Sequence, residues 1–140
     1  MKHAFTHYHT VRLHETDGAG ILFHGQIFTI THNAHEEMMR SAGLPVKQII
    51  ADAPYSIPVA HAEADYTQPI HLGEQLTLKV QVEKMGTRSF TLKTLVDGVS
   101  SSGTPRRKAE VTTVHVTIDL ESGAAIPLPD PVKGVLQHHR

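Results

Sequence analysis

The sequence predicts an α+β fold in which an antiparallel sheet of about five strands wraps around one long central helix. Residues 26–42 carry apolar side chains at spacings of three and four, which is typical of one amphipathic helix. Five other stretches alternate apolar and polar residues, which is typical of half-buried strands. Most of these strands are separated by short turns and therefore pair antiparallel, so the one long helix has to cover their apolar face.

The first strand is expected at residues 3–14, followed by a glycine-containing loop at 15–25. One face of that strand would carry Phe5, His7, His9, Val11 and Leu13. In the helix that follows, the recurring apolar positions are Ile27, Ile30, Ala34, Met38 and Ala42. Gly43 and Pro45 supply the signal that ends it.

Four further strands are expected at 56–66, 75–84, 89–96 and 108–120. Gly86 turns the chain between the second and third of these, and a polar turn at 98–105 separates the third from the fourth. The remaining tail, about 124–140, is rich in proline and is expected to lie along the surface, with His138 and His139 frayed at its end.

Composition excludes several classes of protein. The 140 residues suit one domain, 1–140, and the net charge of −1 gives no basis for nucleic-acid binding. The absence of cysteine excludes disulfides, a thiol nucleophile and Cys-type zinc sites. No apolar run approaches the length of a membrane span, and the first 15 residues lack the apolar core of a signal peptide. We therefore expect a soluble, cytoplasmic protein, and a hydrophobic content of 39% leaves room for a partner subunit to complete the structure.

Three segments carry a resemblance to a known family. They are TDGAGILFH at 16–24 before the helix, ADYTQPI at 64–70 followed by GEQL at 73–76, and GTRSF at 86–90. With the predicted architecture, these segments resemble the hotdog fold and, more closely, the 4-hydroxybenzoyl-CoA thioesterase family, over roughly residues 5–120. Many members have Asn and an aromatic residue at the helix start, where this chain has Gln26 and Phe28 around Ile27. That departure concerns the shape of the substrate pocket and not the fold.

The resemblance implies hydrolysis of an acyl-CoA thioester, with Asp17 and His24 as the catalytic residues. The Asp17 carboxylate would attack the thioester to form an anhydride, or take a proton from water, and both routes stay open. Glu15 is the nearest alternative, but it precedes the glycine loop, so Asp17 is favoured. His24 would orient water or substrate, as would Glu36 on the helix. Backbone N–H groups near Phe23 and His24, unpaired at the start of the helix, would hold the oxyanion.

The expected substrate is an aromatic or short-chain acyl-CoA. The stretch 17–20 (DGAG) is similar to the 1,4-dihydroxy-2-naphthoyl-CoA hydrolases, which makes that thioester the leading substrate. The residues expected to bind the substrate are Gly20, Phe23, Gln26, Ile57 and Val59, of which Phe23, Ile57 and Val59 would lie against the acyl group. Coenzyme A is polyanionic, so we expect Lys84, Arg88 and Ser89, around the Gly86 turn, to bind it. A second basic cluster, 106–108, is the alternative.

In this family the helices of two subunits lie side by side and each site is shared, so the resemblance implies a homodimer that assembles into a homotetramer. No cofactor is expected, because coenzyme A is part of the substrate. Two other functions stay open. The 12 histidines, among them His32 and His35 beside Glu36, raise a metal enzyme, although no zincin motif is present and no metal site is expected. A non-hydrolytic acyl-CoA-binding protein of the same fold is the main alternative, since fold alone does not decide function.

Overall fold

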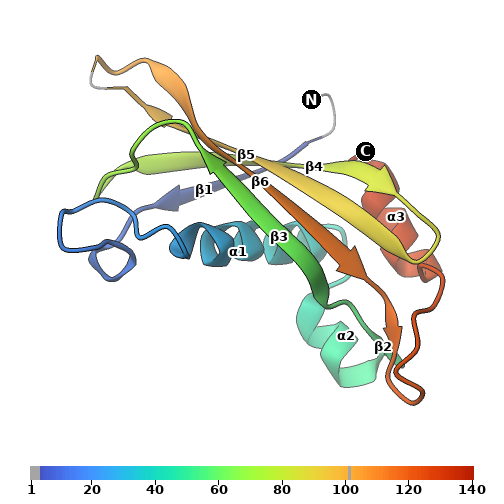
Figure 1. Ribbon diagram of the computed structural model, residues 1–140. Coiled ribbons are helices and arrows are strands. Elements are labelled where there is room, and N and C mark those ends of the chain that lie inside the picture. Colours follow the sequence, from blue (N-terminus) through green and yellow to red (C-terminus); the bar gives the residue numbers. More distant parts are fainter. Residues whose placement is uncertain (1–3, 101) are drawn as a thin grey trace.

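The molecule is a five-stranded antiparallel sheet with one long helix lying across its concave face (Figure 1). The computed structural model describes residues 4–100 and 102–140. In spatial order, the strands are β1 (Phe5–Thr10), β4 (Gln75–Met85), β5 (Ser89–Val99), β6 (Pro105–Val116) and β3 (Val59–Tyr66). The predicted fold class is confirmed. The sequence did not indicate that β1 and β3 form the two edges.

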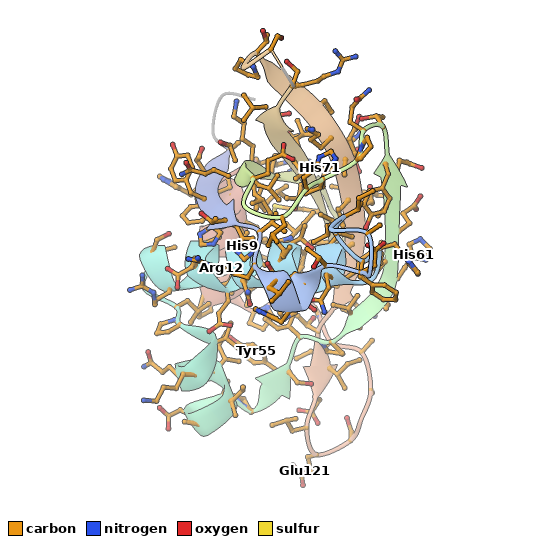
Figure 2. All side chains as sticks on the ribbon, turned by 90° about the vertical axis from the view of Figure 1, so that its left-hand side faces the viewer. His9, Arg12, Tyr55, His61, His71 and Glu121 are labelled. Atoms are coloured by element: carbon orange, nitrogen blue, oxygen red, sulfur yellow. The ribbon has the colours of Figure 1, made fainter. Side chains whose placement is uncertain are left out.

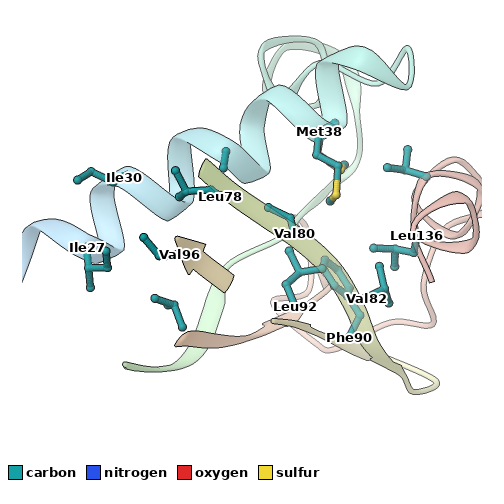
Figure 3. Close-up of a cluster of buried hydrophobic side chains, with 14 of the residues drawn as sticks. Ile27, Ile30, Met38, Leu78, Val80, Val82, Phe90, Leu92, Val96 and Leu136 are labelled. Atoms are coloured by element: carbon teal, nitrogen blue, oxygen red, sulfur yellow. The ribbon is translucent and has the colours of Figure 1, made fainter. Parts of the chain in front are cut away.

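Helix α1 (Gln26–Ser41) supplies the centre of the core. Ile27, Ile30 and Met38 are fully buried and face alternate side chains of the central strands (Figure 3). On the sheet side the buried partners are Leu76, Leu78, Val80, Phe90, Leu92, Val96 and Val111. Helix α1 matches the predicted 26–42 to within one residue and ends where Gly43 adopts a positive φ of 83°.

The first strand is shorter than predicted. Residue 3, where it was expected to begin, lies outside the described residues, and β1 stops at Thr10. The chain then turns into a short 3-10 helix, Leu13–Glu15. Leu13 is therefore 74% exposed instead of facing inward. The buried Glu15 side chain explains the turn, because it accepts hydrogen bonds from the Arg12 N–H (2.7 Å) and from His9 Nε2 (2.8 Å).

A second helix, α2 (Val46–Asp52), occupies a segment that the sequence analysis assigned to no element. Pro45 caps its N-terminus, where a missing N–H does no harm, so this proline both follows α1 and begins α2. After α2, the expected strand at 56–66 divides into the two-residue β2 (Tyr55–Ser56) and the edge strand β3. The expected strand at 108–120 likewise divides into β6 and the two-residue β7 (Ile118–Asp119), which pairs with β2.

The predicted turn at 98–105 is too long, because β5 continues to Val99 and β6 begins at Pro105. Residue 101 of that turn lies outside the described residues. The strand continues because Gly98 leaves room for a buried ion pair between Glu74 and Lys108 (3.2 Å).

The prediction of a surface tail at 124–140 is wrong. Residues Asp130–His138 form helix α3, and Val132, Val135 and Leu136 on its inner face are buried. Pro131 falls in the first turn of the helix, where proline is tolerated. His139 is buried rather than frayed, and its carbonyl oxygen accepts a hydrogen bond from the Val82 N–H (3.1 Å).

Candidate active site

The loop before α1 presents the Asp17 carboxylate to solvent. Oδ1 of Asp17 accepts hydrogen bonds from the backbone N–H groups of Ala19 (2.8 Å) and Ile21 (3.3 Å), so the side chain orders its own loop. Oδ2 accepts no hydrogen bond from any residue in the described part of the chain. The Asp17 carboxylate is therefore held in place through Oδ1, while Oδ2 is available to contact a substrate or water.

The Asp17 loop is also hydrogen-bonded to the segment that follows β3. The Leu22 N–H donates to the Ile70 carbonyl (2.8 Å), and the Leu72 N–H donates to the Gly20 carbonyl (3.0 Å). Gly20 has a φ of 76°, which a residue with a side chain adopts only under strain. The turn therefore requires glycine at position 20. Figure 2 views this end of the molecule, with His9 and Arg12 beside the loop and His71 above it.

The N-terminus of α1 supplies the candidate oxyanion donors, with one correction to the sequence analysis. The Phe23 N–H is already bonded to the Glu15 carbonyl (2.9 Å) and is not available. No residue described by the structure accepts a hydrogen bond from the N–H of His24 or Gly25, and no side chain caps the helix at Gly25. Unpaired N–H groups at the start of a 16-residue helix attract negative charge.

A cavity of about 450 Å³ opens beside these donors. It is lined by Ile21, Leu22, His24, Tyr66, Thr67, Gln68, Pro69 and Ile70. The Tyr66 hydroxyl donates a hydrogen bond to the His24 carbonyl. Because a peptide unit is planar, this bond also orients the N–H of Gly25. Desolvation raises the pKa of Tyr66 to about 12, so its hydroxyl remains a donor at neutral pH.

Tyr66, Thr67 and Gln68 were not proposed as site residues from the sequence. They lie in the segment 64–70 that carried part of the family resemblance, and that was the signal available. Pairing of the Asp17 loop with residues 70–72 brings this segment to the helix N-terminus, and such a contact between distant segments has no local signature.

The remaining predicted residues at this end are exposed or half buried. The rings of Phe23 and His24 lie against each other, with centroids 4.5 Å apart, and both side chains face solvent. Gln26 is half buried in the first turn of α1. The structure thus brings Asp17, Gly20, Phe23, His24 and Gln26 to one end of the molecule.

The other two acyl-binding candidates, Ile57 and Val59, lie elsewhere. Ile57 lines a second cavity, against the C-terminal half of α1, and Val59 is exposed at the start of β3. Helix α1 has 16 residues and is therefore about 24 Å long, and β3 runs from this region back toward the Asp17 loop (Figure 1). Within one chain, these two residues do not join the site around Asp17.

The candidate coenzyme A residues are farther away still. Lys84, Arg88 and Ser89 lie at the β4–β5 turn, next to α3 and at the opposite end of the molecule from the Asp17 loop (Figure 1). Lys84 and Arg88 are exposed. In the alternative cluster, Lys108 is buried against Glu74 (3.2 Å) and Arg107 is paired with Asp97 (2.6 Å), so neither cation is free for a phosphate.

The other carboxylates and the histidines have different surroundings. Glu15 is buried and bonded to Arg12 and His9, whereas Glu36 is exposed on α1 and lines the second cavity. Among the described residues, no three His, Asp or Glu side chains gather closely enough to hold a metal ion.

No helix in the described part of the chain is both long and apolar enough to cross a membrane.

A curved antiparallel sheet wrapped around one long helix is the architecture of the hotdog class of α+β proteins. The family model of the thioesterase-like superfamily matches residues 11–136. The chain belongs to that superfamily.

Individual relatives are consistent with this assignment. The 1,4-dihydroxy-2-naphthoyl-CoA hydrolase of Nostoc punctiforme is 28% identical, over 98% of this chain and 89% of that protein. The protein of the same name from Gloeothece citriformis is 30% identical, over 89% of this chain and 85% of that protein. The crystal structure of a 1,4-dihydroxy-2-naphthoyl-CoA thioesterase from Synechocystis superposes with a TM-score of 0.86 at 28% identity, covering 96% of each chain.

Proposed function

We propose that this chain hydrolyses the thioester of an aromatic acyl-CoA, with 1,4-dihydroxy-2-naphthoyl-CoA as the leading substrate. The observation that carries the proposal is the Asp17 carboxylate, with Oδ2 unoccupied, on the loop that leads to the unpaired N–H groups of His24 and Gly25. The relatives named above act on that thioester by name, which supports the choice of substrate.

In the proposed reaction, the thioester carbonyl oxygen accepts hydrogen bonds from the N–H groups of His24 and Gly25. These donors stabilise the negative charge that develops on the oxygen, an effect worth about 3 kcal/mol per donor in other enzymes. Asp17 Oδ2 either attacks the carbonyl carbon and expels the coenzyme A thiolate, leaving an anhydride that water hydrolyses, or takes a proton from an attacking water. Both routes consume one water and yield a carboxylic acid and free coenzyme A. His24 would orient the water or the substrate.

The proposed assembly is a homodimer that pairs into a homotetramer, with each site shared between two subunits. Asp17 and the basic residues Lys84 and Arg88 lie at opposite ends of one chain, which suits a site completed by a second copy. The edge strand β3 is exposed along most of its length and pairs only with β6 among the described residues, so one of its edges is available for another chain.

No cofactor is required by either route, because coenzyme A arrives as part of the substrate. The phosphate groups of coenzyme A prevent its thioesters from crossing membranes unaided, so the proposed location is the cytoplasm. The partner is the acyl-CoA itself, and the net charge of −1 does not favour nucleic acid.

The test is thiol release from a panel of thioesters by wild type and Asp17→Asn. The panel would contain benzoyl-, 4-hydroxybenzoyl- and 1,4-dihydroxy-2-naphthoyl-CoA together with short and long aliphatic chains. Asn keeps the oxygen that accepts from Ala19 and Ile21, so the loop should stay intact while the carboxylate is lost. We expect kcat/KM to fall by about 10²- to 10⁴-fold.

Asp52→Asn is the matched control, since Asp52 is exposed on α2 and far from the loop in sequence. It should leave thiol release unchanged. An Asp17→Asn variant as active as wild type would contradict the catalytic role assigned to Asp17. Wild-type binding of these thioesters without release of thiol would instead identify the non-hydrolytic acyl-CoA-binding protein.

A further inference from the structure

Tyr66 is the last residue of β3, and the sheet fixes its position. It pairs with Ala109 of β6, and the N–H of the next residue, Thr67, donates to the Lys108 carbonyl (2.9 Å). The Thr67 hydroxyl adds a hydrogen bond to the Arg107 carbonyl (3.0 Å). The phenol ring of Tyr66 therefore extends from a stretch of backbone that β6 holds in place.

The Tyr66 hydroxyl reaches the start of α1, 42 residues away in the sequence, where it donates a hydrogen bond to the His24 carbonyl. No other group among the described residues donates to that carbonyl, because the Phe28 N–H is bonded to the Gly25 carbonyl instead (3.3 Å). The N–H of Gly25 has no described acceptor. The bond from Tyr66 is therefore the one described hydrogen bond made to the peptide that joins His24 to Gly25.

This peptide has little else to orient it. Glycine has more backbone freedom than any other residue, and no side chain caps the helix at Gly25. In a planar trans peptide the C=O and the N–H point in opposite directions, so the hydroxyl that holds the His24 oxygen also determines where the Gly25 hydrogen points. Hydrogen bonds polarise one another, so donation to the carbonyl also strengthens the N–H of the same peptide as a donor.

We propose that Tyr66 is a positioning residue for the reaction, which aims and polarises the Gly25 N–H toward the thioester oxygen by holding the His24 carbonyl. The inference rests on the proposed function, in which this N–H is one of two oxyanion donors. A hydroxyl has one hydrogen, and Tyr66 gives it to His24, so it has none left for the thioester oxygen. Tyr66 therefore acts through the peptide and does not touch the reacting atoms.

The contribution of Tyr66 belongs to the transition state more than to substrate binding. The negative charge on the carbonyl oxygen is small in the bound thioester and grows as the tetrahedral centre forms, so a well-aimed donor favours the transition state. Loss of a whole donor lowers kcat by about 10²- to 10³-fold in other enzymes. Loss of its orientation alone should lower kcat by about ten-fold and leave KM nearly unchanged.

The first measurement is thiol release from the aromatic thioesters by wild type, Tyr66→Phe and Tyr8→Phe. Phe keeps the ring of Tyr66, which is 41% exposed, so the change removes one hydroxyl and should leave the fold intact. Tyr8→Phe is the matched control, because Tyr8 is 63% exposed on β1 and its hydroxyl bonds to no residue in the described part of the chain. We expect kcat to fall about ten-fold in Tyr66→Phe and to stay the same in Tyr8→Phe. An unchanged kcat in Tyr66→Phe, or a change confined to KM, would overturn the inference.

The second measurement observes the peptide itself by NMR. Residues 24 and 25 form the one His-Gly pair in the sequence. Protein labelled with carbonyl-¹³C histidine and ¹⁵N glycine therefore gives a single signal that joins the His24 carbonyl carbon to the Gly25 N–H. A carbonyl carbon that loses a hydrogen bond becomes more shielded, so Tyr66→Phe should move this carbon to lower chemical shift, and Tyr8→Phe should not. An unmoved carbon in Tyr66→Phe would also overturn the inference.

Addition of benzoyl-CoA to labelled Asp17→Asn protein separates the inference from the proposed function. A thioester oxygen that accepts from Gly25 should move the Gly25 hydrogen to higher chemical shift, and should move it less in the double variant Asp17→Asn/Tyr66→Phe. That result, with no thiol release by wild type, would support the positioning role of Tyr66 and reject the hydrolase. Thiol release with equal kcat in wild type and Tyr66→Phe would keep the hydrolase and reject the positioning role.

Discussion

Single residues at one end of the central strands determine how the loop after β3 is held. Glu74 is paired with Lys108 inside the protein (3.2 Å), and its two carboxylate oxygens also accept from the N–H groups of His71 (3.1 Å) and Val99 (3.0 Å). Lys108 Nζ donates in turn to the Pro69 carbonyl (3.0 Å). This buried network fixes residues 69–74, which carry the segment that bonds to the Asp17 loop.

Gly98 makes that network possible, and its replacement is a sharp test. A Cβ at position 98 would lie 2.0 Å from Glu74 Oε2 and 3.0 Å from Lys108 Cε, so Gly98→Ala must displace a buried ion pair. We expect the free energy of unfolding to fall by about 3 kcal/mol. Gly134→Ala is the matched control, because a Cβ there meets nothing within 4 Å and the site is helical. That variant should be stabilised by about 0.5–1 kcal/mol, and denaturant unfolding measures both. A Gly98→Ala protein as stable as wild type would contradict this account of the network.

At the scale of the elements, β6 does not follow the usual pattern of a half-buried strand. Thr113 and His115 point inward and are buried, whereas Val114 and Val116 on the opposite face are only half buried. A strand selected only for core packing would place its valines inside. Polar side chains on the inner face of β6, opposite His35 of α1, therefore mark the second cavity as a region where packing alone does not set the sequence.

We expect helix α3 to contribute to the stability of the fold through its buried face. Its Leu136 side chain is fully buried near the end of β4. Leu136→Ala should lower the free energy of unfolding by about 2–5 kcal/mol through lost burial and the cavity left behind. Lys133→Ala, on the exposed side of the same helix, should change it by less than about 0.5 kcal/mol. Both variants are compared with wild type by denaturant unfolding at one protein concentration, and equal effects would show that α3 is not part of the core.

For the whole molecule, the main feature is the separation of the proposed functional groups. Asp17 lies before α1, Ile57 and the second cavity lie along its C-terminal half, and Arg88 lies beyond the far end of the sheet. In the proposed assembly, a second copy of the chain would bring these separated regions together at one site. The exposed edge of β3 is the part of the sheet most open to such pairing.

Subunit complementation tests this shared site. Asp17→Asn and Arg88→Ala proteins are unfolded together, refolded as a 1:1 mixture and assayed at low substrate concentration. If Asp17 of one subunit acts with Arg88 of another, each mixed dimer contains one intact site, and the mixture should recover about a quarter of wild-type activity. A mixture that shows only the mean of the two separate variants would mean that the site lies within one chain. Light scattering should detect a dimer or tetramer at micromolar concentration.

Part of the candidate site was open to prediction from the sequence. A carboxylate on a glycine loop before the one long helix is a local pattern, and it identified Asp17 and the helix N-terminus. The unavailable Phe23 N–H, the contribution of Tyr66 and the buried state of Lys108 each depend on a partner far away in the chain. The prolines of the tail obscured α3, although Val132, Val135 and Leu136 have helical spacing.

The sequence by itself determined the fold class, the long helix at 26–42 and the central strands, because hydrophobic periodicity is a property of neighbouring residues. Only the tertiary structure decided which strands form the edges, which cations are free, and that His35 contacts both Thr94 and His115. These outcomes depend on packing between segments that are tens of residues apart. Whether a polar side chain becomes exposed, buried or paired is set by that packing and not by its neighbours in sequence.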